Sequence, residues 1–283
     1  MNYQWYPGHM AKARRMMQED SKLVDLIIEL VDARAPMSSR NPDIDEIGRN
    51  KSRIILLNKS DLADAGCNVA WKDYFKQKGW FSLEMNARTG AGIKNIQPLV
   101  QEACREKIER DRKRGIIARP VRAMVAGIPN VGKSTFINSF AGRACTRTGN
   151  KPGVTKGKQW IRLGKNLELL DTPGILWPKF EDQRAGERLA MIGSINDEIL
   201  QVEELAASVI AYLVQNYPEL LKERYQINTQ EDAYRILEEI CISRHCFKKG
   251  QTPDITRASN MVLEDFRSGK IGRITLEHPE EWQ

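Results

Sequence analysis

Residues 121–141 read VRAMVAGIPNVGKSTFINSFA, and their pattern is the clearest indication of the fold. Val121–Ala126 is a short apolar run that predicts a buried strand, and Lys133–Ala141 has the character of a helix. Between them, Gly127–Ser134 matches the pattern GxxxxGK[ST] in the strand–loop–helix context that this motif requires. The alternative is a tight turn without a ligand, but the pattern rarely arises by chance in this context. The sequence therefore predicts a loop that holds phosphate groups.

The chemistry expected of this loop follows from its residue types. Its glycines let backbone N–H groups close around phosphates, and the N-terminus of the following helix adds partial positive charge. Lys133 is expected to reach the β- and γ-phosphates, and Ser134 is expected to bind Mg²⁺. The loop residues expected to contact the nucleotide are Asn130, Val131, Gly132, Lys133, Ser134 and Thr135.

Two segments further along the chain fit the same site. Asp171-Thr-Pro-Gly174 follows another apolar run, Leu167–Leu170. An aspartate at a strand end can hold a Mg²⁺-bound water, and the backbone N–H of Gly174 can meet a γ-phosphate. Thr155 lies between the two motifs and is expected to complete the Mg²⁺ ligands, with an ordinary loop residue as the alternative.

An earlier segment has the residues needed to recognise guanine. Asn58-Lys-Ser-Asp61 follows the apolar run Ile54–Leu57. A carboxylate at Asp61 can accept from both N1–H and the 2-amino group of guanine, which adenine lacks, so such a site would reject adenine nucleotides. Lys59 can lie over the base plane. After the next predicted strand, a backbone N–H can reach the guanine O6. The residues expected to contact the base are Asn58, Lys59, Ser60, Asp61, Asn86 and Ala87.

The order of these motifs is unusual. NKxD, GxxxxGKS and DxxG together are the signature of translation-factor-like GTPases, in which the phosphate loop comes first and NKxD comes late. Here Asn58–Asp61 and Asn86-Ala-Arg88 precede the phosphate loop, so the chain resembles a circularly permuted GTPase. With Trp5-Tyr-Pro-Gly-His-Met10 near its start, it closely resembles the bacterial ribosome biogenesis GTPase A family over essentially the whole chain.

The resemblance implies a circularly permuted P-loop GTPase sheet with helices on both faces and a small all-helical C-terminal domain that binds RNA. It also implies Mg²⁺-dependent GTP hydrolysis late in assembly of the large (50S) ribosomal subunit. The protein would bind rRNA and the precursor particle in its GTP state and leave after ribosome-stimulated hydrolysis. Two alternatives are a tRNA-modifying or membrane-cycle GTPase, and an assembly placeholder in which turnover only triggers release.

Two residues depart from a Ras-like site, and a third follows from the resemblance. Ile175 stands where Ras-like enzymes place the glutamine that orients water, so slow intrinsic turnover is expected. The resemblance places a candidate replacement at His9, which could instead be a residue at the start of a surface helix. Asn130 accompanies K⁺ in related GTPases, where K⁺ supplies transition-state charge, and this implies K⁺ as a second cofactor.

Strand-like and helix-like segments alternate through the first two-thirds of the chain, which predicts an α/β fold with a mainly parallel sheet. The mixed charge run Glu106–Arg114 is expected to be a solvated helix face. The predicted strands are Leu23–Asp32, Ile54–Leu57, Trp80–Met85, Val121–Ala126, Trp160–Leu163 and Leu167–Leu170. The predicted helices here are Trp71–Lys78, Ile93–Arg114 and Lys133–Ala141.

After about residue 180 helical periodicity takes over, which predicts a GTPase domain over 1–180 and a helical domain over 181–283. The segment after DxxG leads directly into the second domain, so we expect GTP to set the orientation of residues 181–283. The predicted helices there are Ile199–Asn216, Glu231–Ser243 and Ile255–Ser268. The candidate RNA contacts are Arg244, Lys248, Lys249, Arg257, Arg267, Lys270 and Arg273.

Composition agrees with this division. The net charge of +7 combines 32 Lys/Arg against 18 Asp/Glu in residues 1–180 with 12 against 19 in residues 181–283, a balance of +14 and −7. A basic first part favours a polyanionic partner such as RNA. Five scattered cysteines and the lack of a long apolar run favour a reduced, cytoplasmic protein, which we expect to be a monomer.

Overall fold

The structure, a computed structural model, describes residues 7–116, 119–145, 159–172, 182–195 and 201–282, with side chains from Arg14 onward. The chain forms two compact units, one of residues 1–181 with 277–283 and the other of residues 182–276. The sequence predicts a division into 1–180 and 181–283. The difference lies at the C-terminal end, where residues 277–283 join the first unit instead of the second.

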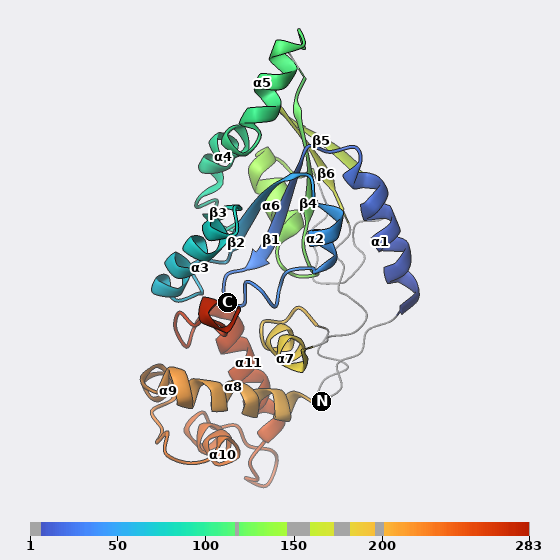
Figure 1. Ribbon diagram of the computed structural model, residues 1–283. Coiled ribbons are helices and arrows are strands. Elements are labelled where there is room, and N and C mark those ends of the chain that lie inside the picture. The colour runs from blue at the N-terminus through green and yellow to red at the C-terminus, as the bar shows by residue number, and fades with distance from the viewer. Residues whose placement is uncertain (1–6, 117–118, 146–158, 173–181, 196–200, 283) are drawn as a thin grey trace. The chain divides into compact units, whose positions relative to one another are not determined.

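The first unit is built on a six-stranded sheet with the order β3-β2-β1-β4-β6-β5 (Figure 1). Neighbouring strands are parallel except at one edge, where β5 runs antiparallel to β6. Every residue of β1 is buried, as expected for a parallel strand that is covered on both faces. The predicted α/β fold is confirmed. The strands are β1 (Leu26–Asp32), β2 (Ser52–Asn58), β3 (Phe81–Glu84), β4 (Val121–Ala126), β5 (Gln159–Leu163) and β6 (Leu167–Asp171).

The helices of the first unit lie on both sides of this sheet (Figure 1). The predicted helix Ile93–Arg114 is interrupted at Cys104. The Ser52 hydroxyl donates to the Ala103 carbonyl over 2.7 Å at the interruption, so a residue of β2 binds a carbonyl that a continuous helix would use itself. The elements are α1 (Pro7–Ser21), α2 (Asp43–Ile47), α3 (Ala65–Gln77), the 3-10 turn η1 (Ile93–Asn95), α4 (Ile96–Ala103), α5 (Arg105–Lys113), α6 (Lys133–Ala141) and the 3-10 turn η3 (Pro279–Trp282).

Two clusters of buried apolar residues hold these helices to the strands. One joins α1 and α2 to the sheet and is formed by Met17, Val24, Ile27, Ile44, Met124, Ala126 and Leu170. The other joins α3 to the sheet and is formed by Val31, Ala33, Ile55, Leu57, Ala63, Trp71, Tyr74 and Phe75. Burying an aliphatic or aromatic side chain of this size contributes about 1.5–3 kcal/mol. The ends of β1 and β2, the second of which carries the NKSD segment, are therefore fixed by packing on α3.

Residues 277–283 complete the first unit from the far end of the sequence. The Glu277 carboxylate is fully buried and accepts hydrogen bonds from the backbone N–H of Met37, from Ser38 N at 3.0 Å and from Ser38 Oγ at 2.7 Å. The Trp71 indole donates to the Glu277 carbonyl over 3.2 Å. Hydrogen bonds to a charged group contribute about 1.5–3 kcal/mol each. The segment therefore fixes the loop that follows β1.

The second unit is helical, and no strand is assigned among the residues described in it. Three of its helices begin at an aspartate whose side chain accepts a backbone N–H: Asp182, Asp232 and Asp254. Two helices, α7 and α9, were not among the predicted ones. The helices are α7 (Gln183–Met191), α8 (Val202–Asn216), α9 (Pro218–Tyr225), α10 (Ala233–Ser243) and α11 (Ile255–Ser268). In the described part of the chain, no helix has the length and apolar character needed to cross a membrane.

Candidate functional site

The GxxxxGKS loop connects the end of β4 to the first turn of α6, at the carboxyl ends of the parallel strands. Two of its glycines are required by close contacts. A Cβ at Gly127 would lie 2.8 Å from the Leu30 carbonyl oxygen, and a Cβ at Gly132 would lie 2.5 Å from the Asn58 amide nitrogen. Gly132 also has a φ of 100°, which side chains disfavour. The loop is therefore seated directly on β1 and on the residue that ends β2.

Asn58 connects the three sequence motifs to one another. Its Nδ2 donates to the Val131 carbonyl over 2.7 Å, and its Oδ1 accepts from the Ala87 N–H over 2.9 Å. Asn58 is buried, and these bonds satisfy both ends of its amide. The segments predicted to bind the base and the phosphates are thus joined before any nucleotide binds. Asn86 fixes the loop that follows β3, since its side-chain oxygen accepts from the N–H groups of Arg88 and Thr89.

Lys59 extends from the NKSD segment toward the phosphate loop. Its ammonium donates to the Asn130 carbonyl over 3.2 Å, and both residues have left-handed backbone conformations, with φ of 58° and 59°. The next residue is also fixed, because Ser60 N donates to the Met85 carbonyl over 3.2 Å. Asp61, the residue expected to read guanine, is exposed immediately after this fixed segment. The arrangement leaves its carboxylate accessible to a ligand.

A buried ion pair supports Lys59, and sequence reasoning missed it. The Asp32 carboxylate at the end of β1 lies 2.9 Å from the Lys59 ammonium, and it accepts from Arg34 Nε and Nη2 at 2.9 and 2.8 Å. Burial opposes the charge on Asp32, but Arg34 and Lys59 outweigh it and hold the pKa of Asp32 well below its usual value. The signal in the sequence was an Asp-Ala-Arg triplet ending an apolar strand.

Lys133 is enclosed at the start of α6, where its ammonium donates to the Gly127 carbonyl over 3.2 Å. Burial lowers the pKa of Lys133 to about 8, although the Asp171 carboxylate acts in the opposite direction. A bound phosphate would supply the negative charge that favours the ammonium form. Above about pH 8, where the free side chain is largely neutral, it would therefore take up a proton when a nucleotide binds.

This pKa gives a prediction for the pH dependence of nucleotide binding. Above about pH 8 the free site loses the Lys133 charge, so GDP affinity should fall by up to about tenfold per pH unit. The measurement is a titration with a fluorescent GDP analogue from about pH 7 to 9, below the pH at which guanine N1–H is lost, with proton uptake followed by calorimetry in two buffers. A Lys133→Met variant should bind weakly at every pH. Constant affinity of the unaltered protein across this range would contradict the assignment of Lys133 as the cation that binds the phosphates.

The residues predicted to hold Mg²⁺ are only partly within the described structure. Asp171 ends β6, is 1% exposed and pairs in register with Val125 of β4, close to where the phosphate loop begins. Ser134 lies on the first turn of α6. A hydroxyl and a carboxylate are oxygen donors of the kind that Mg²⁺ prefers, so these two residues fit the ion. Thr155 and Gly174 lie outside the described residues, and His9 lies in α1 at a position whose side chain is not described.

The candidate site thus has a phosphate loop after β4 and an NKSD segment at the end of β2, on the two strands that flank β1, with the NKSD strand earlier in the chain. This arrangement defines a circularly permuted GTPase. A family model described as 50S ribosome-binding GTPase matches residues 122–244. Ribosome biogenesis GTPase A from Bacillus cereus is 48% identical over 283 residues, which cover 100% of this chain and 96% of that protein. The chain belongs to the ribosome biogenesis GTPase A family, and its activity is the hydrolysis of GTP.

Solved structures agree with this assignment. GNP-bound YlqF from T. maritima has a TM-score of 0.67 and 28% identity, and the match covers 95% of this chain and 99% of that one. A GDP-bound YlqF structure has a TM-score of 0.69 and 27% identity, with 94% of this chain and 100% of that chain covered. The similarity therefore extends across both units of the chain.

Proposed function

We propose that this GTPase acts late in assembly of the large (50S) ribosomal subunit. It binds rRNA and the precursor particle in its GTP state and leaves after ribosome-stimulated hydrolysis. The observation that carries the proposal is the joining of the phosphate loop to the NKSD segment through Asn58, in a chain of the ribosome biogenesis GTPase A family. The basic charge of residues 1–180 supports a polyanionic partner.

The chain's own residues would bind GTP and report on its state. Asp61 would accept from the guanine edge, while Lys59 would lie along the base and Lys133 would bind the terminal phosphates. The DTPG segment, which would sense the γ-phosphate, leads within ten residues to the start of the second unit at Asp182. Ordering of such a segment by the γ-phosphate is a common switch. GTP would thereby change how the helical unit is presented to the precursor particle.

Two cations are proposed as cofactors. Ser134 would bind Mg²⁺ directly and Asp171 would hold it through water, with Thr155 as a further ligand. Mg²⁺ would neutralise charge on the phosphates during hydrolysis. Asn130 is proposed to support K⁺ next to the phosphates, in place of an arginine finger.

The helical unit is proposed to bind RNA through a reduced set of the predicted cations. Arg267 has a different role, because its Nε and Nη2 donate to the carbonyls of Met191 and Ala190 at the end of α7, over 3.0 and 2.8 Å. Lys270 pairs with Glu264 at 3.1 Å. The Arg244 guanidinium likewise donates to the Arg224 carbonyl. The exposed candidates that remain are Lys248, Lys249, Arg257 and Arg273.

Replacement of His9 tests the proposed mechanism of hydrolysis. Ile175 cannot orient water, so we propose that His9 does so once the ribosome completes the site. The His9→Ala variant should lose about 100-fold of the ribosome-stimulated rate and bind GTP about as well as the parent, because positioning of water acts on the transition state. Single-turnover hydrolysis at equal ribosome occupancy measures this effect. An undiminished stimulated rate would leave His9 as a residue at the start of a helix.

The ribosomal role itself is tested by sedimentation. The protein should migrate with large-subunit precursor particles when a non-hydrolysable GTP analogue is present and separate from them with GDP. Equal sedimentation in the two nucleotides would contradict a GTP-dependent cycle. Completion of subunits by a hydrolysis-defective variant would favour a placeholder over a remodelling enzyme.

A further inference from the structure

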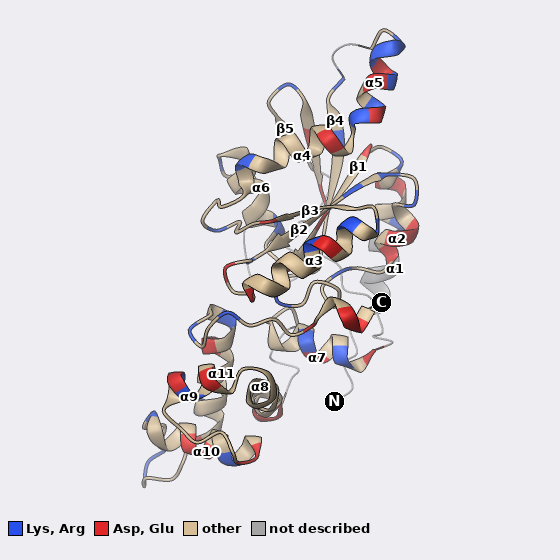
Figure 2. Ribbon diagram, turned by 60° about the vertical axis from the view of Figure 1, so that its left-hand side comes forward, with Lys and Arg blue, Asp and Glu red and all other residues tan. Residues whose placement is uncertain are grey.

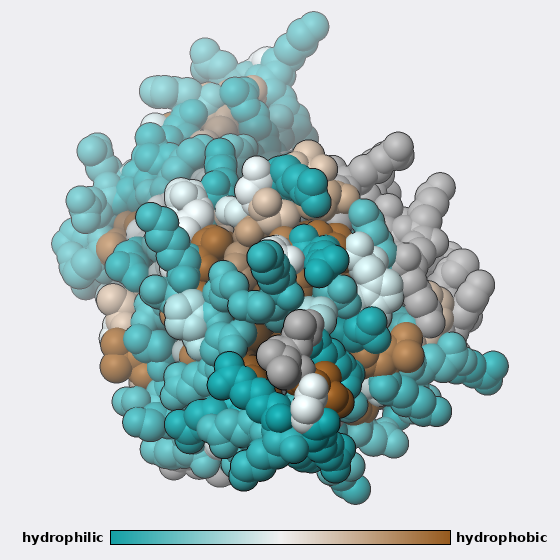
Figure 3. Space-filling model, turned by 90° about the horizontal axis from the view of Figure 1, so that it is seen from above, coloured by the Kyte–Doolittle hydropathy of each residue, from teal (hydrophilic) through white to brown (hydrophobic). Residues whose placement is uncertain are grey.

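The helix α5 is polar on all sides, and none of its residues is buried. A helix without an apolar face gains little from packing, so its persistence in a fold needs another reason. It extends from the first unit at the end away from the carboxyl ends of the strands (Figure 1). The same end is seen from above in Figure 3, where the visible face is mainly hydrophilic. This part of the unit is therefore presented to solvent.

The last turn of α5 gathers more positive than negative charge, with Asp111 as the acidic residue among its cations. Lys107 is paired, at 3.4 Å from Asp25 and 2.7 Å from Asp111. The following cations are all exposed and form no ion pair with any residue in the described parts of the chain: Arg110, Arg112, Lys113 and Arg114. Figure 2 shows basic residues at the outer tip of this helix. Part of this charge balances the helix C-terminus, but four cations within five residues, with one aspartate among them, exceed what that requires.

A pocket at the same end of the first unit is also lined by basic residues. It has a volume of about 450 Å³ and lies between the end of α6 and the β5–β6 hairpin. The turn of this hairpin is next to the start of β4, since Val121 N donates to the Asn166 carbonyl over 2.9 Å. The pocket is therefore at the opposite end of β4 from the phosphate loop, and the nucleotide does not account for it.

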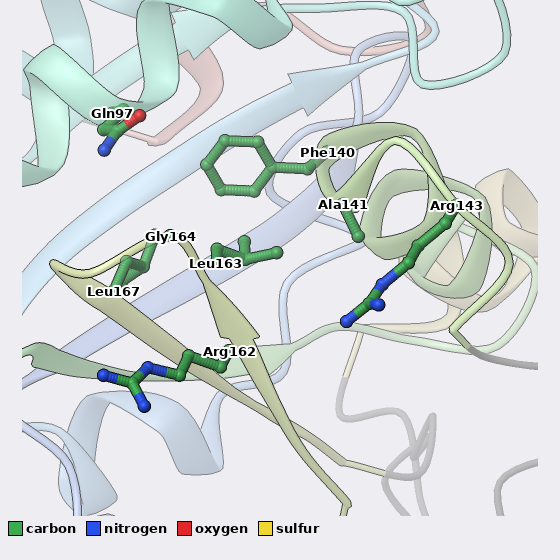
Figure 4. A pocket seen from close by; sticks show the side chains of 8 residues that line it. All are labelled: Gln97, Phe140, Ala141, Arg143, Arg162, Leu163, Gly164 and Leu167. Atoms are coloured by element: carbon green, nitrogen blue, oxygen red, sulfur yellow. The ribbon is translucent and has the colours of Figure 1, made fainter.

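Two arginines stand at this pocket, and no acidic residue lines it. Figure 4 shows Arg143 beyond the end of α6 and Arg162 on β5; Phe140 and Leu163 lie together, and the Arg162 side chain extends away from them. Neither guanidinium has an ion-pair partner among the residues that the structure describes, whereas Arg122 nearby on β4 is paired with Glu168 at 3.0 Å. Glu168 is the register partner of Arg162 and is already paired with Arg122, so this end of the sheet keeps an excess of positive charge, which favours an anionic ligand.

We propose that the α5 tip (Arg110, Arg112, Lys113 and Arg114) and the Arg143–Arg162 pocket, which lie at the same end of the first unit, both bind the phosphate backbone of folded RNA. The inference rests on the proposed function and adds a contact surface on the GTPase unit, remote from the nucleotide. α5 carries no aromatic side chain for stacking on bases and one aliphatic side chain, Ile108. It is therefore suited to phosphates of a double helix instead of unpaired bases or a lipid layer.

The test uses the full chain with a GTP analogue, an RNA hairpin of about 16–20 base pairs and, separately, purified large-subunit precursor particles. Two double variants remove charge from the surface: Arg110→Gln with Arg112→Gln, and Arg143→Gln with Arg162→Gln. A matched control is Lys222→Gln with Arg235→Gln, which removes two cations that are 61% and 68% exposed and lie beside glutamates. GTP affinity and basal hydrolysis should be unchanged in all three.

Each surface variant should bind the hairpin about tenfold more weakly near 150 mM salt and reduce the slope of log affinity against log salt by about 2, while the control keeps the parent slope. Slopes equal to the parent's in both surface variants would overturn the proposal. So would failure of the unaltered protein to bind the hairpin, or its tighter binding to phosphatidylserine vesicles. Binding to the hairpin without binding to the particles would instead contradict the ribosomal role and leave the RNA surface supported.

Discussion

Replacing Asp61 with asparagine is expected to convert a GTP-binding protein into one that prefers xanthosine triphosphate. The guanine edge presents two donors to the carboxylate, and an amide meets one of them with its own donor. Loss of matched partners in a site of this kind reduces binding by up to roughly 10⁴-fold. Xanthine has a carbonyl at C2 that can accept from the new amide. Asn58 and Lys59 keep their bonds to the phosphate loop, so the rest of the site should persist.

The measurement is the Kd of GTP and of xanthosine triphosphate for both proteins. A matched control is Asp64→Asn, three residues later in the chain. The Asp64 side chain caps α3 by accepting from the Cys67 N–H over 3.0 Å, and asparagine caps a helix equally well. This variant should keep the preference for GTP. Unchanged GTP affinity in Asp61→Asn would remove the NKSD segment from the proposed base site.

Replacing Lys133 with alanine should reduce productive GTP binding and hydrolysis by about 10³-fold, since a preorganised cation is lost from the phosphates. Ser134→Ala should have a comparable effect through Mg²⁺. The fold should survive because, among the residues that the structure describes, the Lys133 ammonium bonds to the Gly127 carbonyl, and Lys133 belongs to neither apolar cluster. Circular dichroism checks the fold, and single-turnover kinetics measures the loss.

Lys76→Ala is the control for Lys133→Ala. Lys76 is an exposed lysine in the last turn of α3, so its removal changes the net charge by the same amount at a distance from the loop. Its GTP hydrolysis should equal that of the parent. Normal hydrolysis by Lys133→Ala would show that the GxxxxGKS loop does not hold the phosphates as proposed.

The sequence predicted the elements whose cause is local. β4, α6 and α11 have the predicted bounds because an apolar run, a phosphate-loop motif and a helical period are each contained within the element itself. The interruption at Cys104 depends on Ser52, which is remote in the sequence. Residues 277–283 join the first unit because the Glu277 carboxylate is buried against a loop about 240 residues earlier. The hydrophobic periodicity of the sequence does not indicate such a contact.

The same distinction applies to the candidate site. The motif residues Asn58, Val131 and Ala87 meet in space because the carboxyl ends of parallel strands share one edge of the sheet. Asp32 was missed because it supports the site indirectly, by pairing with the Lys59 ammonium, and lies in no familiar motif. Arg267 was misinterpreted because charge in a sequence does not show whether a guanidinium faces solvent or helix carbonyls.

The position of Glu277 also sets an order for the biosynthesis of this enzyme. Translation proceeds from the N-terminus, and N-terminal domains generally fold first. Here the loop at Met37 and Ser38 cannot acquire its buried carboxylate until residues 182–276 have been made. A nascent chain that stops within the helical unit would hold a GTPase unit with this loop open beside Asp32. Complete assembly of the nucleotide-binding unit is thus deferred until the helical unit has left the translating ribosome, so the two mature together.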